Sequence, residues 1–410
     1  MRTICKKASK LLLMGLLITL LLVSAVVADE QVSLIFNGQE YQADVYVEKG
    51  VSYVSVESLV KIPGLEVEQE GYVPLRKFFE DRKGNVNWNN KEKHVIVSWR
   101  QTNDEWSADK LMIESSRVLE EINTYKMKGN VAIKMNISAP DALEIPEIPE
   151  ITTTMEGEFQ QEPLSMYIKQ TMDLPVSDTL LSEEESDLFQ QGSMVTEMVW
   201  TDNAIYQKMP LSDQWIVQDL SNMDMMGQLT EMLQATPQQS LETMRKFGIV
   251  YVFGEDVVID GKEYYTVKNY VDSATFKKVM EEFNIAGLLS DTQGLTEQTE
   301  QNDEVVPESA KEMQQIFDQL LASMEVNYYV DSLISKETLL TEGMLFDMNL
   351  KYAMDETVNP EGPINIEMKM TGEFELNEFG TEVQLPDVSN AITQEEYLEQ
   401  IINEMEVPEE

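Results

Sequence analysis

Cysteine and histidine are almost absent from this sequence. Its 410 residues include one of each, Cys5 and His94. Because Cys5 lies so close to the start, the rest of the chain can form neither a disulfide nor a thiol nucleophile. One histidine cannot supply the imidazoles of a copper site, and zinc sites also draw on cysteine and histidine. We therefore expect no metal, no cofactor and a fold that is stabilised by packing alone.

The same shortage argues against the common catalytic centres. Ser-His-Asp and Cys-His arrangements need a histidine base beside a nucleophile, and His94 lies in a segment that is typical of a surface turn. No glycine-rich phosphate loop is present. The 74 acidic residues do not single out a pair with the roles of a glycosidase acid and base. We expect no catalytic residues and no enzymatic activity.

Basic residues are scarce as well. The chain has 30 Lys and Arg against 74 Asp and Glu, a formal charge of −44. Such a charge repels nucleic acid, so no nucleic-acid partner is expected. The acidic run Glu183–Asp187 could hold calcium, but it lacks the spacing of an EF-hand loop and is typical of a solvated turn.

The first residues have the layout of a secretory signal peptide. Four basic residues between Arg2 and Lys10 precede the apolar run Leu11–Val23, and small residues lead to Ala28. This predicts a leader over residues 1–28, cleaved after Ala28, and a secreted or cell-surface protein. Residues 11–28 also reach the lower limit of a spanning helix, so a retained anchor is the alternative. No cysteine follows the run, which excludes a lipid attached to cysteine at the cleavage site.

Residues 31–100 are expected to form a small α+β domain. The dipeptide Asn37-Gly38 between Val32–Phe36 and Tyr41–Val47 predicts a β-hairpin. Two short helices and two strands should follow. Their expected ranges are a start near Ser55, then Leu75–Asp81, Val86–Trp88 and His94–Trp99. Trp88 is expected in the core, and Arg76 is expected to pair with Glu80 one helical turn later.

Part of this region resembles a known domain. Val73-Pro74-Leu75-Arg76, followed by Glu80, Gly84, Val86, Trp88 and Val95-Ile96-Val97, is similar to the copper amine oxidase N-terminal-like domain of secreted bacterial proteins. Residues 53–59 resemble a diverged first copy of the same strand-to-helix step. The likeness is to the stalk of an amine oxidase and not to its copper-bearing part. It therefore implies a spacer or docking role.

From about Asn103 the pattern changes to long alternating segments. Ala108–Ile122 has the spacing of an amphipathic helix and leads into Tyr125–Ile137, whose alternation predicts a one-sided antiparallel strand. Similar strands are expected at Ile151–Phe159, Met166–Met172, Met194–Trp200, Ala204–Met209, Trp215–Gln218, Tyr264–Val271, Asn327–Val330, Met344–Met354 and Ile364–Leu376. Helices are expected at Met223–Leu233, Gln239–Phe247, Ser273–Phe283 and Glu308–Ser323. An acidic tail, residues 391–410, ends the sequence.

The order of these elements resembles the LolA-like and LppX-like lipoprotein carriers over residues 105–390. The local cues are Tyr125-Lys126-Met127-Lys128-Gly129 after the helix, Asn203-Ala204-Ile205-Tyr206 before Trp215, residues 260–265 and Leu385-Pro386. The resemblance implies a half-barrel, a bent sheet that wraps around helices. The expected fold is therefore α+β, a small N-terminal module followed by a large curved antiparallel sheet.

Methionine is frequent on the alternating positions of these strands. The candidate cavity residues are Met127, Met135, Met166, Met198, Trp200, Met344, Phe346, Met348, Met368 and Met370. Unbranched thioethers adapt to irregular shapes, so a concave face lined in this way could hold an acyl chain or an apolar peptide. Methionine also fills gaps in ordinary cores, so plain packing against the helices is the other interpretation.

These observations favour a non-catalytic binding protein of the cell envelope. A lipid or other apolar ligand would occupy the half-barrel, and the first domain would act as a spacer or docking module. The alternative is a structural or adhesive surface protein whose two domains bind cell-wall polymer or another envelope protein.

Overall fold

The computed structural model describes residues 32–89, 93–139, 148–173, 193–208, 214–219, 236–282, 323–354 and 362–405. The chain divides into two compact units, the first comprising Met1–Ser58 and Gln69–Ser98 and the second Leu59–Glu68 and Trp99–Glu410. Three of the expected features lie outside the described residues: the leader, the acidic run Glu183–Asp187 and the helix Met223–Leu233. The helix expected at Glu308–Ser323 also lies outside them, except for its last residue.

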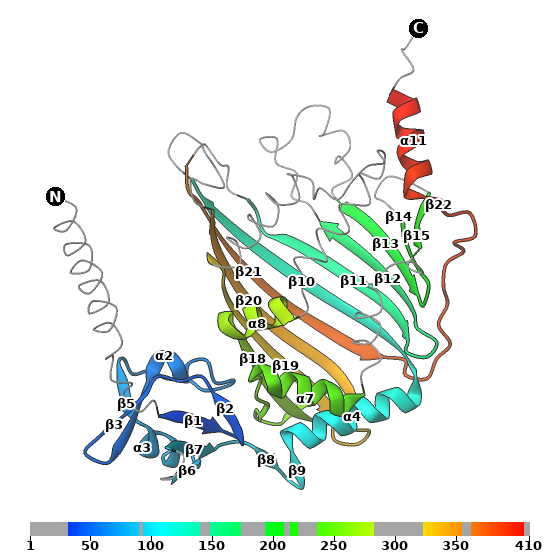
Figure 1. Cartoon of the computed structure of the whole chain (residues 1–410). Coiled ribbons are helices and arrows are strands. Elements are labelled where there is room, and N and C mark those ends of the chain that lie inside the picture. The colour runs from blue at the N-terminus through cyan, green and yellow to red at the C-terminus, as the bar shows by residue number, and fades with distance from the viewer. Residues whose placement is uncertain are drawn as a thin grey trace, which may run out of the picture. The chain divides into compact units, whose positions relative to one another are not determined.

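The first unit contains two small sheets and two short helices (Figure 1). One sheet has the strand order β2-β1-β7-β6 and the other β3-β4-β5. The elements are β1 (Ser33–Phe36), β2 (Gln39–Tyr41), β3 (Val45–Glu48), β4 (Val51–Ser55), α2 (Val56–Leu59), β5 (Tyr72–Pro74), α3 (Leu75–Glu80), β6 (Asn85–Asn89) and β7 (His94–Ser98).

The hairpin predicted at Asn37-Gly38 is confirmed. Both residues have positive φ, 51° and 85°, and Phe36 pairs with Gln39 across the turn. The single strand expected at Tyr41–Val47 is wrong, because β2 ends at Tyr41 and β3 begins at Val45 in the other sheet. Two hydrogen bonds of the Asp44 backbone fix the segment that connects the two sheets. Its carbonyl accepts a hydrogen bond from the Ser55 amide at 2.9 Å, and its amide donates to the Ser58 hydroxyl.

The core of the first unit is made by aliphatic and phenylalanine side chains. Leu34, Phe36, Leu75 and Phe79 are fully buried. Trp88, expected in this core, is 38% exposed, so that prediction is wrong. Trp88 lies near the end of β6. The interior of the unit is already filled by the smaller side chains named above.

The predicted pair on α3 is present. Arg76 Nη1 lies 3.2 Å from Glu80 Oε1, one helical turn along. Both side chains are well exposed, so the pair contributes little to stability.

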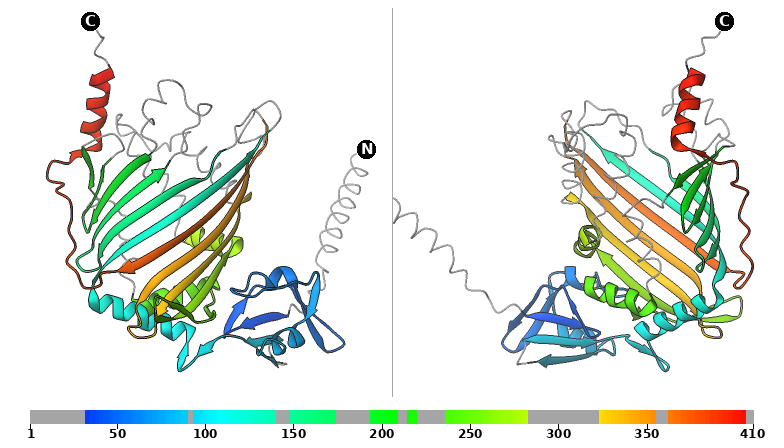
Figure 2. Two further views of the ribbon diagram at one scale, coloured as in Figure 1. Left: turned by 180° about the vertical axis from the view of Figure 1, so that it is seen from behind. Right: turned by 45° about the vertical axis from the view of Figure 1, so that its right-hand side comes forward.

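The second unit is dominated by a 13-stranded sheet. Its strands are β10 (Thr124–Ser138), β11 (Ile151–Gln160), β12 (Ser165–Asp173), β13 (Ser193–Thr201), β14 (Ala204–Lys208), β15 (Trp215–Asp219), β16 (Val252–Phe253), β17 (Val257–Ile259), β18 (Lys262–Asp272), β19 (Glu325–Ser335), β20 (Thr341–Met354), β21 (Ile364–Asn377) and β22 (Ile392–Thr393). Figures 1 and 2 show the sheet bent into a trough. The predicted α+β class, a small module followed by a large curved antiparallel sheet, is confirmed.

Four helices of this unit lie within the described residues: α4 (Ala108–Ile122), α7 (Pro237–Phe247), α8 (Ser273–Glu282) and α11 (Gln394–Met405). The predicted span of α4 is confirmed at both ends. The Ser107 side chain caps its first turn, and Asn123 ends it with φ of 72°. A capping box of Thr236 and Gln239 begins α7, and Gly248 ends it with φ of 84°. Strands β8 (Thr102–Asn103) and β9 (Trp106–Ser107) form a two-stranded sheet that precedes α4.

The central contact of the sheet joins strands that are far apart in the chain. The strand order is β16-β18-β19-β20-β21-β10-β11-β12-β13-β14-β15-β22. The late strand β21 therefore lies beside the first long strand β10, paired antiparallel from Lys126↔Asn377 to Ser138↔Asn365. Apart from the short β22, which pairs parallel with β15, neighbouring strands within each half of the sheet are antiparallel, and the β10–β21 pairing unites the two halves.

One face of the sheet carries the charges. Lys134 Nζ lies 2.8 Å from Glu150, and Lys351 Nζ lies 2.7 Å from Glu367. Further cross-strand ion pairs on this face are Lys126–Glu158, Lys128–Glu156, Lys208–Glu197 and Lys369–Asp347. Because these groups are exposed or only half-buried, they favour the correct strand register more than they add stability. We call this side the outer face and the opposite side the inner face.

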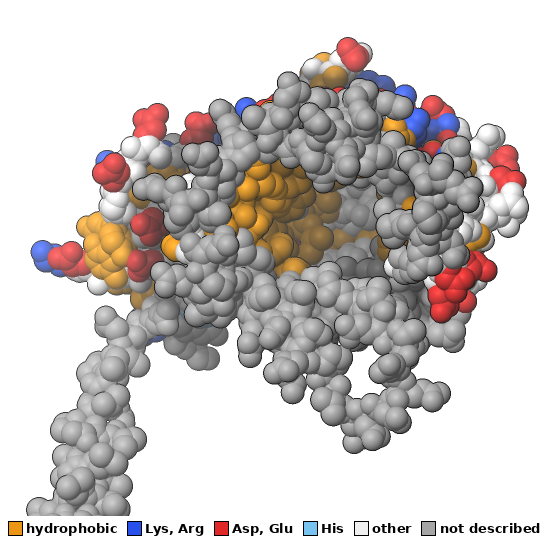
Figure 3. Space-filling view, turned by 90° about the horizontal axis from the view of Figure 1, so that it is seen from above, with side chains coloured by type: hydrophobic (Ala, Val, Ile, Leu, Met, Phe, Trp, Pro, Cys, Tyr) orange, Lys and Arg blue, Asp and Glu red, His pale blue; other side chains and the backbone are white. Residues whose placement is uncertain are grey.

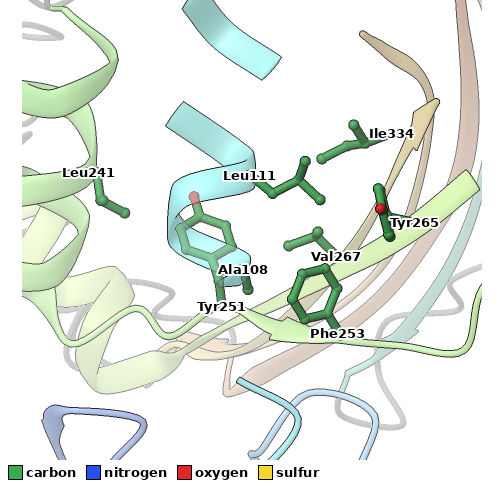
Figure 4. Close-up of a cluster of buried hydrophobic side chains, with 8 residues drawn as sticks. All are labelled: Ala108, Leu111, Leu241, Tyr251, Phe253, Tyr265, Val267 and Ile334. Atoms are coloured by element: carbon green, nitrogen blue, oxygen red, sulfur yellow. The ribbon is translucent and has the colours of Figure 1, made fainter. Parts of the chain in front are cut away.

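Helices α4 and α7 cover one end of the inner face (Figure 4). Ala108 and Leu111 of α4 and Leu241 of α7 pack against side chains of the sheet and its edge. The sheet-side members of the cluster are Tyr251, Phe253, Tyr265, Val267 and Ile334. A hydrogen bond of 2.9 Å between the Ser115 and Thr341 hydroxyls ties α4 to β20.

This cluster predicts a large effect for Leu111→Ala. Leu111 is fully buried, so truncation leaves a cavity and should lower the free energy of unfolding by about 3 kcal/mol. Urea denaturation followed by circular dichroism measures this change. Leu345→Ala is the matched control, because Leu345 is 42% exposed on the outer face and should change stability by less than about 0.5 kcal/mol. Equal effects of the two substitutions would contradict the assignment of the core.

Candidate functional site

The strand register places all ten predicted cavity residues on the inner face. Side chains alternate along a strand, and directly paired residues share a face. Met135 pairs with Met368, Met348 with Met370, and Met166 with Trp200. The other four follow from the same alternation: Met127 on β10, Met198 on β13, and Met344 and Phe346 on β20.

Seven of the ten residues form two groups on this continuous face. Met135, Met348, Met368 and Met370 adjoin one another on β10, β20 and β21. Met166, Met198 and Trp200 lie on β12 and β13, beyond β10 and β11, roughly three strand spacings or 14 Å from β21. Other apolar side chains bridge the interval in register: Ile133 pairs with both Met370 and Ile151.

These side chains are less covered than the core cluster. All ten are half-buried, whereas Leu111 and Ile334 at the helix-covered end of the same face are fully buried. Figure 3 shows a hollow whose visible wall consists of hydrophobic side chains. The inner face is thus packed at one end, where α4 and α7 lie, and only partly covered along the methionine-bearing strands.

The inner face is also electrically neutral along its central strands. From β10 to β13 and on β20 and β21, the inward positions of the described segments 125–137, 151–159, 166–172, 194–200, 344–354 and 364–376 hold no Asp, Glu, Lys or Arg. Burial raises the pKa of Tyr125 and Tyr328 above the ordinary value, so these inward phenols add no charge to the face. In a chain of formal charge −44 this neutrality sets the face apart.

Along the central strands, the uncharged polar side chains of the inner face other than tyrosine lie on one side of it, on β11, β12 and β13. Gln170 of β12 lies directly opposite Thr196 of β13, and Thr153 lies on the neighbouring β11. Thr153 is only 3% exposed. On the other side of β10, along β20 and β21, the inward positions are occupied by methionine, aliphatic and aromatic residues and one glycine. The face therefore has a mainly apolar side and a side with neutral hydrogen-bonding groups.

Glycines within the strands allow aromatic rings to lie flat on the inner face. A Cβ added to Gly129 would come within 2.1 Å of the Phe374 ring, and one added to Gly372 within 2.3 Å of the Phe346 ring. The two rings are stacked, with centroids 5.9 Å apart. Glycine also lets a strand bend sharply, as a trough requires. The sequence analysis did not single out these glycines, although each interrupts an otherwise apolar alternation.

A depression that the sequence did not predict lies on the outer face. It has a volume of about 850 Å³, and its lining includes Asn130, Thr152, Thr154, Asp347 and Thr371. Tyr329, Leu345, Lys268 and Asp331 also line it, so the depression combines apolar, polar and charged groups and contains no methionine. Within the described residues, no group of three or more His, Cys, Asp or Glu side chains could hold a metal ion. Nor does any described helix have the length and apolar character to cross a bilayer.

The chain belongs to a family of unknown function, DUF6612, whose sequence model matches residues 107–392. This match covers the helix α4 and nearly all of the large sheet. No curated protein matches the sequence.

Several solved structures have a likeness to the second unit. LprF from Mycobacterium bovis is 12% identical with a TM-score of 0.28, and the match covers 68% of this chain and 96% of LprF. The lipoprotein LppX from Mycobacterium tuberculosis is 10% identical with a TM-score of 0.30, and the match covers 68% and 98% of the two chains. A DUF1329 family protein from Desulfovibrio piger is 10% identical with a TM-score of 0.19, covering 68% and 95%. Likenesses with TM-scores this low say nothing about ligand or activity.

The ring contact at Gly372 generates a double-mutant prediction. Gly372→Ala should destabilise the second unit by roughly 1–3 kcal/mol, because the new methyl group must displace the Phe346 ring. In a Phe346→Leu background the same change should cost less, which a double-mutant cycle in urea would measure as a coupling. Gly343→Ala is the matched control, since its nearest neighbour, a methyl carbon of Leu333 at 3.0 Å, can move aside. Strictly additive effects would show that the ring contact does not constrain Gly372.

Proposed function

We propose that the second unit is a non-catalytic binding module that holds an uncharged apolar ligand, such as a lipid, on its inner face. The observation that carries this proposal is the placement of ten methionine and aromatic side chains on one neutral, half-buried, concave face. A large apolar surface that is not fully covered by its own chain is typical of a ligand or partner site.

The side-chain chemistry favours a flexible apolar ligand over a rigid one. Methionine has an unbranched, polarisable side chain that adapts to different shapes. The group formed by Met135, Met348, Met368 and Met370 can therefore follow the contour of an acyl or isoprenoid chain. Burial of such a chain stabilises the complex by roughly 25 cal/mol per Å² of apolar surface, less the cost of ordering it.

The neutrality of the face restricts the polar end of the ligand. A charged headgroup brought onto this face would lose hydration without meeting an opposite charge, which is costly. An uncharged polar group, such as a hydroxyl, ester or amide, can exchange its water for the half-buried side chains of Gln170 or Thr196. We infer an amphiphile that lies with its neutral polar end over β11–β13 and its chains over β10, β20 and β21.

The proposed setting is the bacterial cell envelope. The leader layout of residues 1–28 favours export, with cleavage after Ala28, and the sequence resemblance of residues 73–97 to a stalk-like domain favours a spacer or docking role for residues 31–100. The binding domain would then span residues 105–390, with the acidic tail after it. Binding without catalysis agrees with the scarcity of histidine and cysteine in the sequence.

Native mass spectrometry of the protein purified from its own host tests the proposal. The expected result is a stoichiometric mass increment, identified by organic extraction and lipid analysis as an uncharged amphiphile. Met348→Trp and Met368→Trp should fill the inner face and lower the bound fraction at least tenfold. Leu345→Trp, on the outer face of the same strand as Met348, should leave it unchanged.

Two results would contradict the proposal. One is a clean apo mass together with no uptake of an environment-sensitive apolar dye. The other is equal loss of ligand from the Met348→Trp and Leu345→Trp proteins, which would indicate that ligand binding does not depend on the inner face.

A further inference from the structure

We propose that the first unit carries a second binding site, independent of the inner face, at which a cluster of three tyrosines, two of them exposed, binds a neutral polysaccharide. The tyrosine cluster consists of Tyr46 on β3, Tyr53 on β4 and Tyr72 on β5. These strands form the three-stranded sheet of the first unit.

The cluster is built by strand pairing. Tyr46 and Tyr53 are directly opposite each other, and their rings stack with centroids 5.1 Å apart and planes 11° apart. The Tyr72 ring meets Tyr46 edge-on, with centroids 5.0 Å apart. Three aromatic rings from three strands are thus held in one place by the sheet backbone, with little rotamer freedom left to lose on binding.

The cluster faces solvent, whereas neighbouring residues of the same strands supply the core. Tyr46 is 40% exposed and Tyr72 is 45% exposed. Val54 and Val73, each next in sequence to a cluster tyrosine, are 0% and 5% exposed. One side of this sheet therefore contributes side chains to the core of the unit, and the other side presents aromatic rings to solvent. Val51, 39% exposed and paired with Glu48, extends the apolar surface.

Carboxylates surround the rings. The Tyr72 hydroxyl donates a hydrogen bond to Asp44, which raises the pKa of Tyr72, and Glu57 is close enough to raise it further. Glu48 is exposed and lies 3.5 Å from Lys49. The rim of the cluster is thus rich in hydrogen-bond acceptors that lie next to apolar ring surface.

This combination fits a sugar. A pyranose ring has an apolar C–H face that packs on aromatic rings, and hydroxyl groups at its edge that donate to carboxylates. The acidic rim and the chain's formal charge of −44 repel polyanions, so the polysaccharide should be neutral.

A protein partner fits this surface less well. Stable protein interfaces bury roughly 800 Å² on each side. Three tyrosines that are each less than about half exposed, with one valine beside them, offer much less. The short, rigid platform instead matches the width of a few sugar units.

Affinity electrophoresis of the full chain tests this inference, with cellulose derivatives, amylose and soluble chitin fragments as neutral probes and polygalacturonate as the polyanionic probe. We expect retardation by at least one neutral polymer and none by polygalacturonate. Tyr46→Ala combined with Tyr72→Ala should weaken binding at least tenfold, and Tyr46→Phe, which keeps the ring, should retain it within about twofold. Circular dichroism and thermal unfolding verify that each variant is folded.

Trp88→Ala is the matched control. Trp88 is 38% exposed in the same unit but belongs to the other sheet, so its loss should not change polysaccharide binding. The inference is overturned if no neutral polymer binds, if polygalacturonate binds best, or if Trp88→Ala and the double tyrosine variant weaken binding equally. A concentration-dependent dimer that the double variant abolishes, without polysaccharide binding, would identify the surface as a contact between copies and also overturn it.

Discussion

The pairing of β10 with β21 is the contact on which the second unit depends. It joins strands more than two hundred residues apart and unites the two halves of the sheet. Because side chains alternate with a period of two, a slip of β21 by one residue against β10 would move Glu375 onto the inner face and Leu376 onto the outer face. The ion pairs on one side and the thioethers on the other both penalise that slip. This register therefore determines the location of the candidate ligand contacts on β10 and β21.

The inner face owes its character to this separation of charge. The acids and lysines of the central strands are placed on the outer face, so a protein of high negative charge can present a neutral apolar surface. Gly129 and Gly372 add a second constraint, since the rings of Phe374 and Phe346 occupy the space of their missing side chains. Bending of the sheet and flat packing of the rings together give the face its concave form. Its packed end, held by α4 and α7, provides rigidity without covering the methionine-bearing strands.

The two units expose aromatic and apolar surface in different ways. In the second unit the apolar surface is broad, concave and free of charge along its central strands, which suits a flexible amphiphile. In the first unit it is small, formed by three tyrosines and bordered by carboxylates, which suits a hydroxyl-rich ring. Each unit also has a buried core that is separate from this surface. A protein with both sites could hold an envelope lipid while attached to a neutral wall polymer.

Local patterns in the sequence were sufficient to predict most elements and the face on which the methionines lie. The alternation of Tyr125–Ile137 and Ile364–Leu376 identifies inward and outward positions without a structure, because strand periodicity is a property of the backbone. The hairpin at Asn37-Gly38, the helix Ala108–Ile122 and the Arg76–Glu80 pair are likewise local. Local patterns could not predict three other features: the exposure of Trp88, the break between β2 and β3, and the ring contacts of Gly372. They depend on which strands become neighbours and how much space other residues have already filled. Such features are set by long-range packing, so only the tertiary structure determines them.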